Sequence, residues 1–423
     1  MVVAAPFRGL RFDPDVVGDP GAVTAPPYDV ISPAARDAYE AQSPYNMVRL
    51  ILARTELQGP DRYRPVAELM AAWRDQGALV LDPVPALYLY EEAYELRGRR
   101  RVQRGVLASV TLDDTASWIL PHERTMAGPV SDRLHLLEAT RANLSPVFGV
   151  YAGAGRTAAV LDDLTATPPA VDCVDEAGVR HRLWPVSDGE RIAAWCGLLA
   201  DHRVLIADGH HRYRTSLAYR DAMRAAAGPG PWDRVLMFLV DADLHGPSIQ
   251  PIHRLLAEVP AHTVLDALAQ DFEARPAGSP AELEAALAGL PHDVTGFGLV
   301  GSGGSWLLVA GDQAALEGEV GIDRHPLDAE VLHGPVLAKR LGVTDFEGQV
   351  VYENDLAAAA AQVERGAAAS LLVLRPTPFA QVVAVAQSGG TLPQKTTFFY
   401  PKPRDGLVLR PLHPDTFARS SSG

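Results

Sequence analysis

The spacing of apolar residues along this chain predicts helices and hairpin strands that alternate in no regular order. Residues 64–82, "RPVAELMAAWRDQGALVLD", place apolar side chains at helical intervals until Gly77 closes the helix. The period changes over residues 86–114, where aromatic and polar residues alternate and a Gly-Arg turn separates two predicted strands. This stretch therefore favours a β-hairpin.

Similar patterns continue on either side of this hairpin. Ser32 is the predicted cap of a helix that begins with Pro33. Residues 132–153 predict a helix that leads through Ser145-Pro146 into a strand, and residues 170–186 predict a hairpin that turns at 176–178. A helix over 188–201 and a strand over 203–207 follow them.

The composition becomes rich in Ala and Gly from about residue 256, where Ser279, Pro280 and Glu282 have the spacing of a capping box. Hairpins are frequent and clear βαβ repetition is absent, so we predict an α+β fold with mixed sheets and flanking helices. We expect a catalytic region over residues 1–255 and a smaller C-terminal α/β region over 256–423 that packs on it.

Composition narrows the class of protein. A chain of 423 residues with 47% hydrophobic content can bury two or three domain cores, while its apolar runs are too short to span a membrane. The two cysteines, Cys173 and Cys196, lack metal-type spacing, and nothing marks the chain for export, so we expect a cytoplasmic protein.

The net charge of −14 argues against a nucleic-acid coat. The arginine-rich residues 97–104 are then best interpreted as an exposed hairpin turn, with a local basic site as the alternative.

The stretch "VLIADGHHRYRTSLAYRDA", residues 204–222, places an acid, a glycine, two histidines and an arginine where a strand gives way to a helix. Gly209 permits the turn, and a helix start presents unpaired N–H groups and a positive dipole end, which favour an anion such as phosphate. Arg212 could bind that phosphate through two hydrogen bonds from its guanidinium group. His210 or His211 could transfer a proton, and Asp208 could orient a histidine or accept a proton. The alternative is that Asp208 only caps the helix and the histidines face solvent.

A second polar stretch covers residues 119–134, "ILPHERTMAGPVSDRL". A zinc-protease motif would need a second histidine four residues after His122, on the same helix face. Position 126 is Met, in a Pro/Gly context that we predict to be a loop, so this motif is excluded. A loop carrying His122, Glu123, Arg124 and Thr125, with Arg133 beyond its Gly-Pro pair, could instead close over an anionic substrate. Glu123 would then act as general base or magnesium ligand. The alternative is a surface loop held by ion pairs.

Three shorter stretches offer weaker candidates. His253 and Arg254 follow a predicted strand, and Tyr28-Asp29 follow two prolines that suit either a site or a strand edge. Lys395, with two threonines after it and Lys402 further on, resembles the donor set of a phosphate site, although a solvated strand lysine is the simpler interpretation. No GxxxxGK, GxGxxG or GxSxG motif supports a P-loop, a dinucleotide site or a serine hydrolase.

Taken together, several of these stretches resemble one family. Six stretches, taken in their order along the chain, are similar to the family numbered 1015 among domains of unknown function. They are "PPYDVIS", "NMVRLIL", "ILPHERTMAGPVSDRLHLLEATRANLSPVFGVY", "ADGHHRYRTSLAYRD", "IQPIHRLL" and "LPQKTTFFYPKPRDGLVL". The box "DGHHR", residues 208–212, also resembles the ParB and sulfiredoxin superfamily, which includes a free serine kinase. This second resemblance implies a ParB/sulfiredoxin-like core that binds nucleotide phosphates at a helix start.

These observations leave two principal hypotheses, beside a third in which the polar motifs support another chemistry such as sugar or amino-acid ligation. The first is an enzyme that transfers or removes a phosphate group on a small hydroxylated metabolite; the family resemblance implies serine or phosphoserine. Mg²⁺ and a nucleotide or pyrophosphate donor would suit it, although no residues are spaced closely enough to name metal ligands. The second is a ParB-like nucleotide-binding regulator linked to DNA, against which the acidic charge and the lack of a clear basic recognition helix argue.

Overall fold

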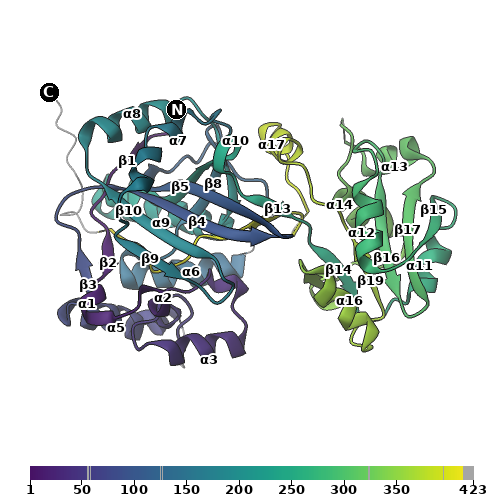
Figure 1. The fold of residues 1–423 in the computed structure, drawn as a ribbon, viewed down its shortest axis with the longest axis horizontal. Coiled ribbons are helices and arrows are strands. Elements are labelled where there is room, and N and C mark those ends of the chain that lie inside the picture. The colour runs from purple at the N-terminus through teal and green to yellow at the C-terminus, as the bar shows by residue number, and fades with distance from the viewer. Residues whose placement is uncertain are drawn as a thin grey trace. The chain divides into compact units, whose positions relative to one another are not determined.

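The computed structural model of the chain describes residues 1–54, 57, 59–123, 125, 127–322, 324–393 and 395–412. It divides into two compact units (Figure 1): unit 1 comprises Met1–Pro247 and the segment from Pro401 onward, and unit 2 comprises Ser248–Tyr400. None of the helices in the described part of the chain is long and apolar enough to cross a membrane.

Unit 1 is built on a mixed nine-stranded sheet, in the order β6-β11-β8-β12-β5-β4-β10-β9 with β1 paired to β5. The β11–β6 and β12–β8 pairs are parallel, whereas the other pairs are antiparallel. The strands are β1 (Ala4–Ala5), β4 (Leu87–Leu96), β5 (Arg99–Thr111), β6 (Ile119–Leu120), β8 (Val147–Tyr151), β9 (Val171–Val174), β10 (Arg180–Val186), β11 (Val204–Asp208) and β12 (Arg234–Asp241).

The local predictions for this unit are largely confirmed. β4 and β5 pair along their length across the turn at Arg97-Gly98, and β9 and β10 form the second hairpin. Ser32 caps its helix, because its Oγ accepts a hydrogen bond from the Ala35 N–H. The helices are α1 (Pro14–Val17), α2 (Pro20–Val23), α3 (Pro33–Gln42), α4 (Val48–Ile51), α5 (Arg64–Asp75), α6 (Ala127–Thr140), α7 (Arg156–Ala159), α8 (Gly189–Leu199), α9 (His210–Ala227) and α10 (Ala242–His245), with 3₁₀ turns η1 (Tyr28–Val30), η2 (Gly59–Tyr63), η3 (Asp162–Ala166) and η4 (Pro231–Asp233).

One local prediction is wrong. The Gly-Pro pair at Gly128 and Pro129, which we predicted to be in a loop, lies in the first turn of α6. Proline is tolerated there because the first N–H groups of a helix have no intrahelical partner, and its fixed φ suits the helix. Within residues 119–134, Ile119–Leu120 therefore form a short strand and the residues from Ala127 onward belong to a helix.

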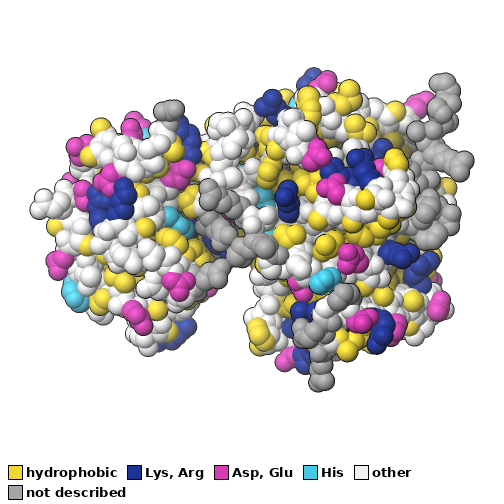
Figure 2. All heavy atoms as spheres, turned by 180° about the vertical axis from the view of Figure 1, so that it is seen from behind, with side chains coloured by type: hydrophobic (Ala, Val, Ile, Leu, Met, Phe, Trp, Pro, Cys, Tyr) yellow, Lys and Arg dark blue, Asp and Glu magenta, His cyan; other side chains and the backbone are white. Residues whose placement is uncertain are grey.

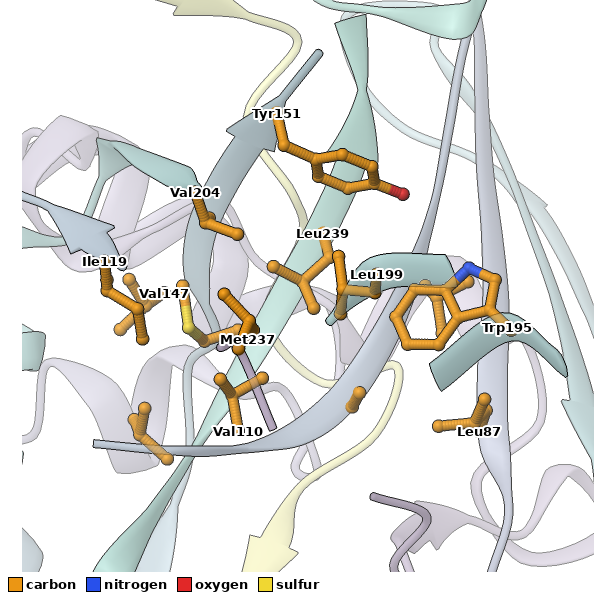
Figure 3. Packing of buried hydrophobic residues seen from close by; sticks show 14 of the residues in the cluster. Leu87, Val110, Ile119, Val147, Tyr151, Trp195, Leu199, Val204, Met237 and Leu239 are labelled. Carbon is orange, nitrogen blue, oxygen red and sulfur yellow. The ribbon is translucent and has the colours of Figure 1, made fainter. Parts of the chain in front are cut away.

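The main core of unit 1 lies between its sheet and α8. Trp195 and Leu199 of α8 point at Leu87, Val110 and Leu239 on the strands (Figure 3), and all five side chains are nearly inaccessible to solvent. Burial of such large apolar side chains contributes roughly 1.5–3 kcal/mol each. This core holds the strand ends that carry the polar residues described below.

The end of the chain returns to unit 1. Asp405 forms a bridge with Ala25, Leu409 forms one with Leu10, and β21 (Arg410–Pro411) pairs with β7 (Ala142–Asn143). A separate pair, β2 (Leu10–Phe12) and β3 (Leu79–Leu81), lies beside a second core formed by the N-terminal helices. Long-range strand pairing thus brings residues 401–412 back to elements from the first half of the chain.

Unit 2 contains a six-stranded antiparallel sheet, in the order β15-β17-β16-β19-β14-β18, with buried apolar clusters on both faces. The predicted capping box of Ser279 and Glu282 is formed. Its strands are β13 (Ser248–Gln250), β14 (His253–Leu256), β15 (Phe272–Ala277), β16 (Gly296–Gly301), β17 (Gly304–Ala310), β18 (Val350–Glu353), β19 (Ser370–Val373) and β20 (Phe398–Tyr400), and its helices are α11 (Ala261–Leu268), α12 (Pro280–Ala288), α13 (Gln313–Val320), α14 (Asp328–Val331), the π-helical Leu332–Arg340, α15 (Phe346–Gln349), α16 (Leu356–Glu364) and α17 (Phe379–Gln387).

The two units together have the predicted α+β fold with mixed and antiparallel sheets. The domain boundary that we expected after residue 255 falls inside β14, which pairs with β18 and β19 of unit 2. The Ala- and Gly-rich composition marks the helices of unit 2, but the first strands of that unit precede the change in composition.

Candidate functional site

The strand-to-helix turn of residues 204–212 has the geometry that its sequence predicts. β11 ends at Asp208, and α9 begins at His210 directly after Gly209, whose φ of 90° lies in the left-handed region. A side chain at this position would be strained, and its Cβ would lie 3.0 Å from the guanidinium carbon of Arg212. Glycine is therefore needed both for the turn and for the close approach of Arg212.

Asp208 forms ion pairs with two cationic side chains. Its Oδ2 accepts a hydrogen bond from Arg212 Nη2 at 2.5 Å, and its Oδ1 accepts one from Lys402 Nζ at 2.6 Å. Lys402 Nζ also lies 3.5 Å from Oδ2 of Asp29. Burial by itself would raise the pKa of Asp208, but the charges of Lys402 and Arg212 outweigh it and lower that pKa. Asp208 is therefore a carboxylate at neutral pH, and both of its oxygens are occupied.

Arg212 connects this ion-pair cluster to a cavity. It donates a second hydrogen bond to the backbone carbonyl of Pro146 and lines a cavity of about 50 Å³. A cavity of this size has room for a few water molecules or a small polar group. The lining combines two arginines, four hydroxyl side chains and an apolar floor: Arg133, Arg212, Tyr28, Ser145, Thr215, Ser216, Asn143, Leu136, Leu137, Ala142, Leu144 and Val235.

The second arginine of the cavity is held from several sides. Arg133 donates to the Ile51 carbonyl at 2.6 Å and to the Tyr63 hydroxyl at 3.0 Å, and it forms an ion pair with Asp132. Its guanidinium carbon lies 4.3 Å from the centre of the Tyr28 ring, within the range of a cation–π contact. Arg133 and Tyr28, predicted from separate stretches of sequence, are therefore brought together.

Asp405 is a buried carboxyl that sequence reasoning missed. Its side chain is 0% exposed, its Oδ2 accepts a hydrogen bond from Ser145 Oγ at 2.6 Å, and its Oδ1 has no hydrogen-bond partner among the described residues. Burial raises the pKa of Asp405 to about 7, with Arg212 and Ser145 acting against the shift and the carboxylates of Asp29 and Asp208 adding to it. The segment "PKPRDGLVL" contains both Lys402 and Asp405. Lys402 was singled out together with Lys395, but nothing local distinguishes Asp405 from a solvated aspartate.

Two of the predicted histidines contact each other. The rings of His122 and His210 have centroids 4.7 Å apart and meet edge to face, and the His122 backbone N–H donates to His210 Nε2 at 3.3 Å. Burial lowers the pKa of His122 to about 4 and places the pKa of His210 well below its ordinary value. Both imidazoles are therefore neutral near pH 7, and the Nε2 atom of His210 acts as a hydrogen-bond acceptor.

The other predicted residues of unit 1 lie at or near the start of a helix. His211 is partly exposed in the first turn of α9, Glu123 is half-buried, and Thr125 is exposed just before α6. Arg124 lies outside the described residues.

The remaining predicted residues belong to unit 2 and have their described contacts there. His253 Nδ1 accepts the Leu374 N–H at 3.2 Å. Arg254 donates to His333 Nε2 at 3.0 Å and to the backbone carbonyl of Lys395 at 3.0 Å. Lys395 is exposed, but it lies in a turn and not in the strand of our simpler interpretation.

Two further properties bear on the site, namely the charged side chains on the surface and the grouping of metal-ligating residues. On the face shown in Figure 2, Lys and Arg side chains lie beside Asp and Glu side chains. Within the described ranges, no three His, Cys, Asp or Glu side chains are grouped so that they could hold a metal ion.

Comparison with known families identifies the class of protein. The family model described as "Protein of unknown function (DUF1015)" matches residues 4–336, so the chain belongs to this family, as its motifs suggested. No curated protein matches the chain.

Several solved structures are similar to this chain at low sequence identity. A free serine kinase in complex with AMP is 14% identical with a TM-score of 0.37, over 71% of this chain and 91% of that one. A conserved hypothetical protein from Pyrococcus furiosus is 14% identical with a TM-score of 0.35, over 71% and 95% of the two chains. SbnI with a C-terminal truncation, from Staphylococcus aureus, is 13% identical with a TM-score of 0.37, over 72% and 87%.

Proposed function

We propose that this protein is an enzyme that transfers or removes a phosphoryl group on a small hydroxylated metabolite, with serine or phosphoserine as the first candidate. The observation that carries the proposal is the cavity beside the start of α9, where Arg212 and Arg133 line the same small space as four hydroxyl side chains. Guanidinium groups and hydroxyls are the donors that recognise phosphate oxygens.

The ion pairs around Asp208 fit this function by preorganising positive charge. Asp208 accepts hydrogen bonds from Arg212 and Lys402, which fixes both cations in a largely buried site. Cations held in place stabilise the charge of a transferring phosphoryl group without reorganisation during the reaction. Because the pKa of Asp208 is lowered and its oxygens are occupied, we assign it a positioning role in place of the role of general base.

The proposal also assigns a proton donor and a phosphoryl donor. His210 is neutral and its Nε2 accepts the His122 N–H, so proton donation to a leaving group falls to His211, which is partly exposed. A nucleotide or pyrophosphate remains the donor that we propose for the kinase direction. We assign no residue to Mg²⁺, because the described carboxylates and histidines are not grouped as metal ligands.

Ligand binding tests the proposal directly. Calorimetry of the full chain with phosphoserine, serine, ATP, ADP and pyrophosphate should show binding of at least one phosphorylated compound. Arg212→Lys keeps the positive charge beside Asp208 but loses the planar fork, so it should weaken that binding about tenfold or more. Arg191→Lys is the matched control, because Arg191 forms an ion pair with Asp163 on the surface of unit 1. Equal binding by the two variants, or no binding by the unmodified chain, would contradict the proposal.

Turnover then separates the two directions of the reaction. Release of phosphate from phosphoserine would identify a phosphatase, and transfer to serine from ATP or pyrophosphate would identify a kinase. His211→Ala should lower the active direction by about a hundredfold if His211 transfers the proton. An unchanged rate would remove His211 from the mechanism.

A further inference from the structure

The Ser145–Asp405 pair has the arrangement of a nucleophile and its base. Ser145 Oγ donates a hydrogen bond of 2.6 Å to Asp405 Oδ2, a distance within the range expected for a hydroxyl and the group that removes its proton. The two residues are 260 positions apart in the sequence and come from separate connecting segments. Their contact is therefore a product of the tertiary structure.

The backbone on both sides holds this pair in place. Asp405 exchanges two backbone hydrogen bonds with Ala25, of 2.8 and 3.1 Å. The next residue, Gly406, has a φ of 101° and approaches Met47 so closely that a Cβ would lie 2.6 Å from the Met47 Cγ. On the other side, Ser145 precedes Pro146, whose carbonyl accepts a hydrogen bond from Arg212.

Asp405 differs from the other carboxylates around it. Asp208 forms ion pairs with two cations, and Asp29 lies near Lys402. The Asp405 side chain instead accepts one hydrogen bond, from the Ser145 hydroxyl, and its buried Oδ1 has no hydrogen-bond partner among the described residues. Its raised pKa, near neutral pH, is the value that favours a general base, because both protonation states are then accessible.

Ser145 lines the cavity to which the function proposed above assigns the phosphoryl group. It lines the same cavity as Arg212 and Arg133, so an oxygen attacking from Ser145 would have two cations available for the charge of the phosphoryl group. Resting on the function proposed above, we propose that Ser145 is the nucleophile of this enzyme and Asp405 its general base, so that the phosphoryl group is carried transiently on Ser145.

Ser145 Oγ forms a bond to phosphorus while the bond from phosphorus to the leaving oxygen of the donor breaks. The Ser145 proton moves to Asp405 Oδ2, and the leaving alcohol or nucleoside diphosphate takes up a proton from solvent or a nearby acid. Phosphorylated Ser145 then passes its phosphoryl group to water in a phosphatase or to a substrate hydroxyl in a kinase. As the bond between Ser145 Oγ and phosphorus breaks, Ser145 Oγ takes back the proton held by Asp405, and the attacking hydroxyl releases its proton to the solvent or acid that protonated the leaving group.

A small alkyl fluorophosphonate tests the pair without requiring the natural substrate. Attack by Ser145 forms an oxygen–phosphorus bond and releases fluoride, and mass spectrometry of peptides locates the adduct. We expect modification of Ser145, a rate that rises with pH around a midpoint near 7, and a loss of about a hundredfold or more in Asp405→Asn. Ser117→Ala is the matched control, since Ser117 is an exposed serine of unit 1 outside the lining of the cavity, and it should react like the unmodified chain.

Three results would overturn the inference that Ser145 is an activated nucleophile. Absence of an adduct on Ser145, an equal rate in Asp405→Asn, or a rate that does not change between pH 5 and 9 would exclude an activated serine. The pH profile of the unmodified chain carries the test by itself if Asp405→Asn fails to fold. A reactive Ser145 in a chain that binds no phosphorylated compound would remove the proposed function and leave the pair intact. Phosphate binding beside an unreactive Ser145 would do the opposite.

Discussion

Lys402 Nζ lies 2.6 Å from Oδ1 of Asp208, although the two residues are 194 positions apart in the sequence. Asp208 ends β11, and Lys402 belongs to the segment that returns to unit 1 after residue 400. The last part of the described chain therefore completes an ion-pair cluster that the strand-to-helix turn begins.

The first prediction concerns this pair. Lys402→Met removes one of the two cations of Asp208 and leaves a buried carboxylate with Arg212 as its remaining partner, so we expect a loss of about 1–3 kcal/mol in the free energy of unfolding. Denaturant titration of Lys402→Met, Asp208→Asn and the double variant should give a clear coupling energy. The same cycle on the surface pair Arg191 and Asp163 should give a much smaller coupling, because exposed ion pairs contribute little. Equal coupling in both cycles would contradict a structural role for Lys402.

The second prediction separates backbone strain at the turn from the position of Arg212. Gly209 at the start of α9 and Gly228 after its end have φ values of 90° and 76°. Substitution by alanine should destabilise the protein by about 1 kcal/mol or more in each case. A Cβ at position 209 would press on Arg212, whereas one at position 228 has nothing within 4 Å. Only Gly209→Ala should weaken the binding of phosphorylated compounds, as measured by calorimetry. Similar affinities in the two variants would show that Arg212 is not part of that site.

The third prediction uses the raised pKa of Asp405. The folded protein retains the proton of Asp405 up to about pH 7, whereas the unfolded chain loses it near pH 4. The contribution of this group to stability is therefore complete below pH 4 and is lost as the pH rises to 7. Asp405→Asn removes this dependence, so its stability relative to the unmodified chain should increase between pH 4 and 8, by at most about 4 kcal/mol. Parallel profiles of unfolding free energy against pH would show that Asp405 is ionised throughout.

The fourth prediction concerns the buried imidazole of His122. Because burial lowers its pKa to about 4, the folded protein should keep His122 neutral at pH values where an exposed histidine is protonated. Its neutral form contributes stability that is present above pH 6.5 and is lost as the pH falls towards 4. NMR titration of the ring carbons, with His122→Phe to assign the signal, should show no protonation of His122 above pH 5. A midpoint near 6.5 would place the ring in contact with solvent.

Much of the local structure was predictable because it depends on neighbours in the sequence. The cap at Ser32, the capping box at Ser279 and the glycine turn at Gly209 each rest on hydrogen bonds or dihedral angles within a few residues. The same local rules were ambiguous at Gly128 and Pro129, because a proline marks a loop and the first turn of a helix equally well.

The candidate site was only partly predictable. Asp208, Gly209 and Arg212 lie in one motif, and their chemistry could be inferred from it. Lys402 and Asp405 join them because β21 pairs with β7 and Asp405 bridges to Ala25, and these pairings depend on contacts between distant parts of the chain. The family match over residues 4–336 does not extend to the segment that contains them.

The sequence by itself thus determined the α+β class and the turn that presents Asp208 and Arg212, since both follow from the periodicity and backbone preferences of adjacent residues. Only the tertiary structure decided that Asp405 would meet Ser145 in a buried, nearly uncompensated position. Burial and the pKa it shifts are set by what the folded chain places around a side chain, and no local pattern of residues specifies that.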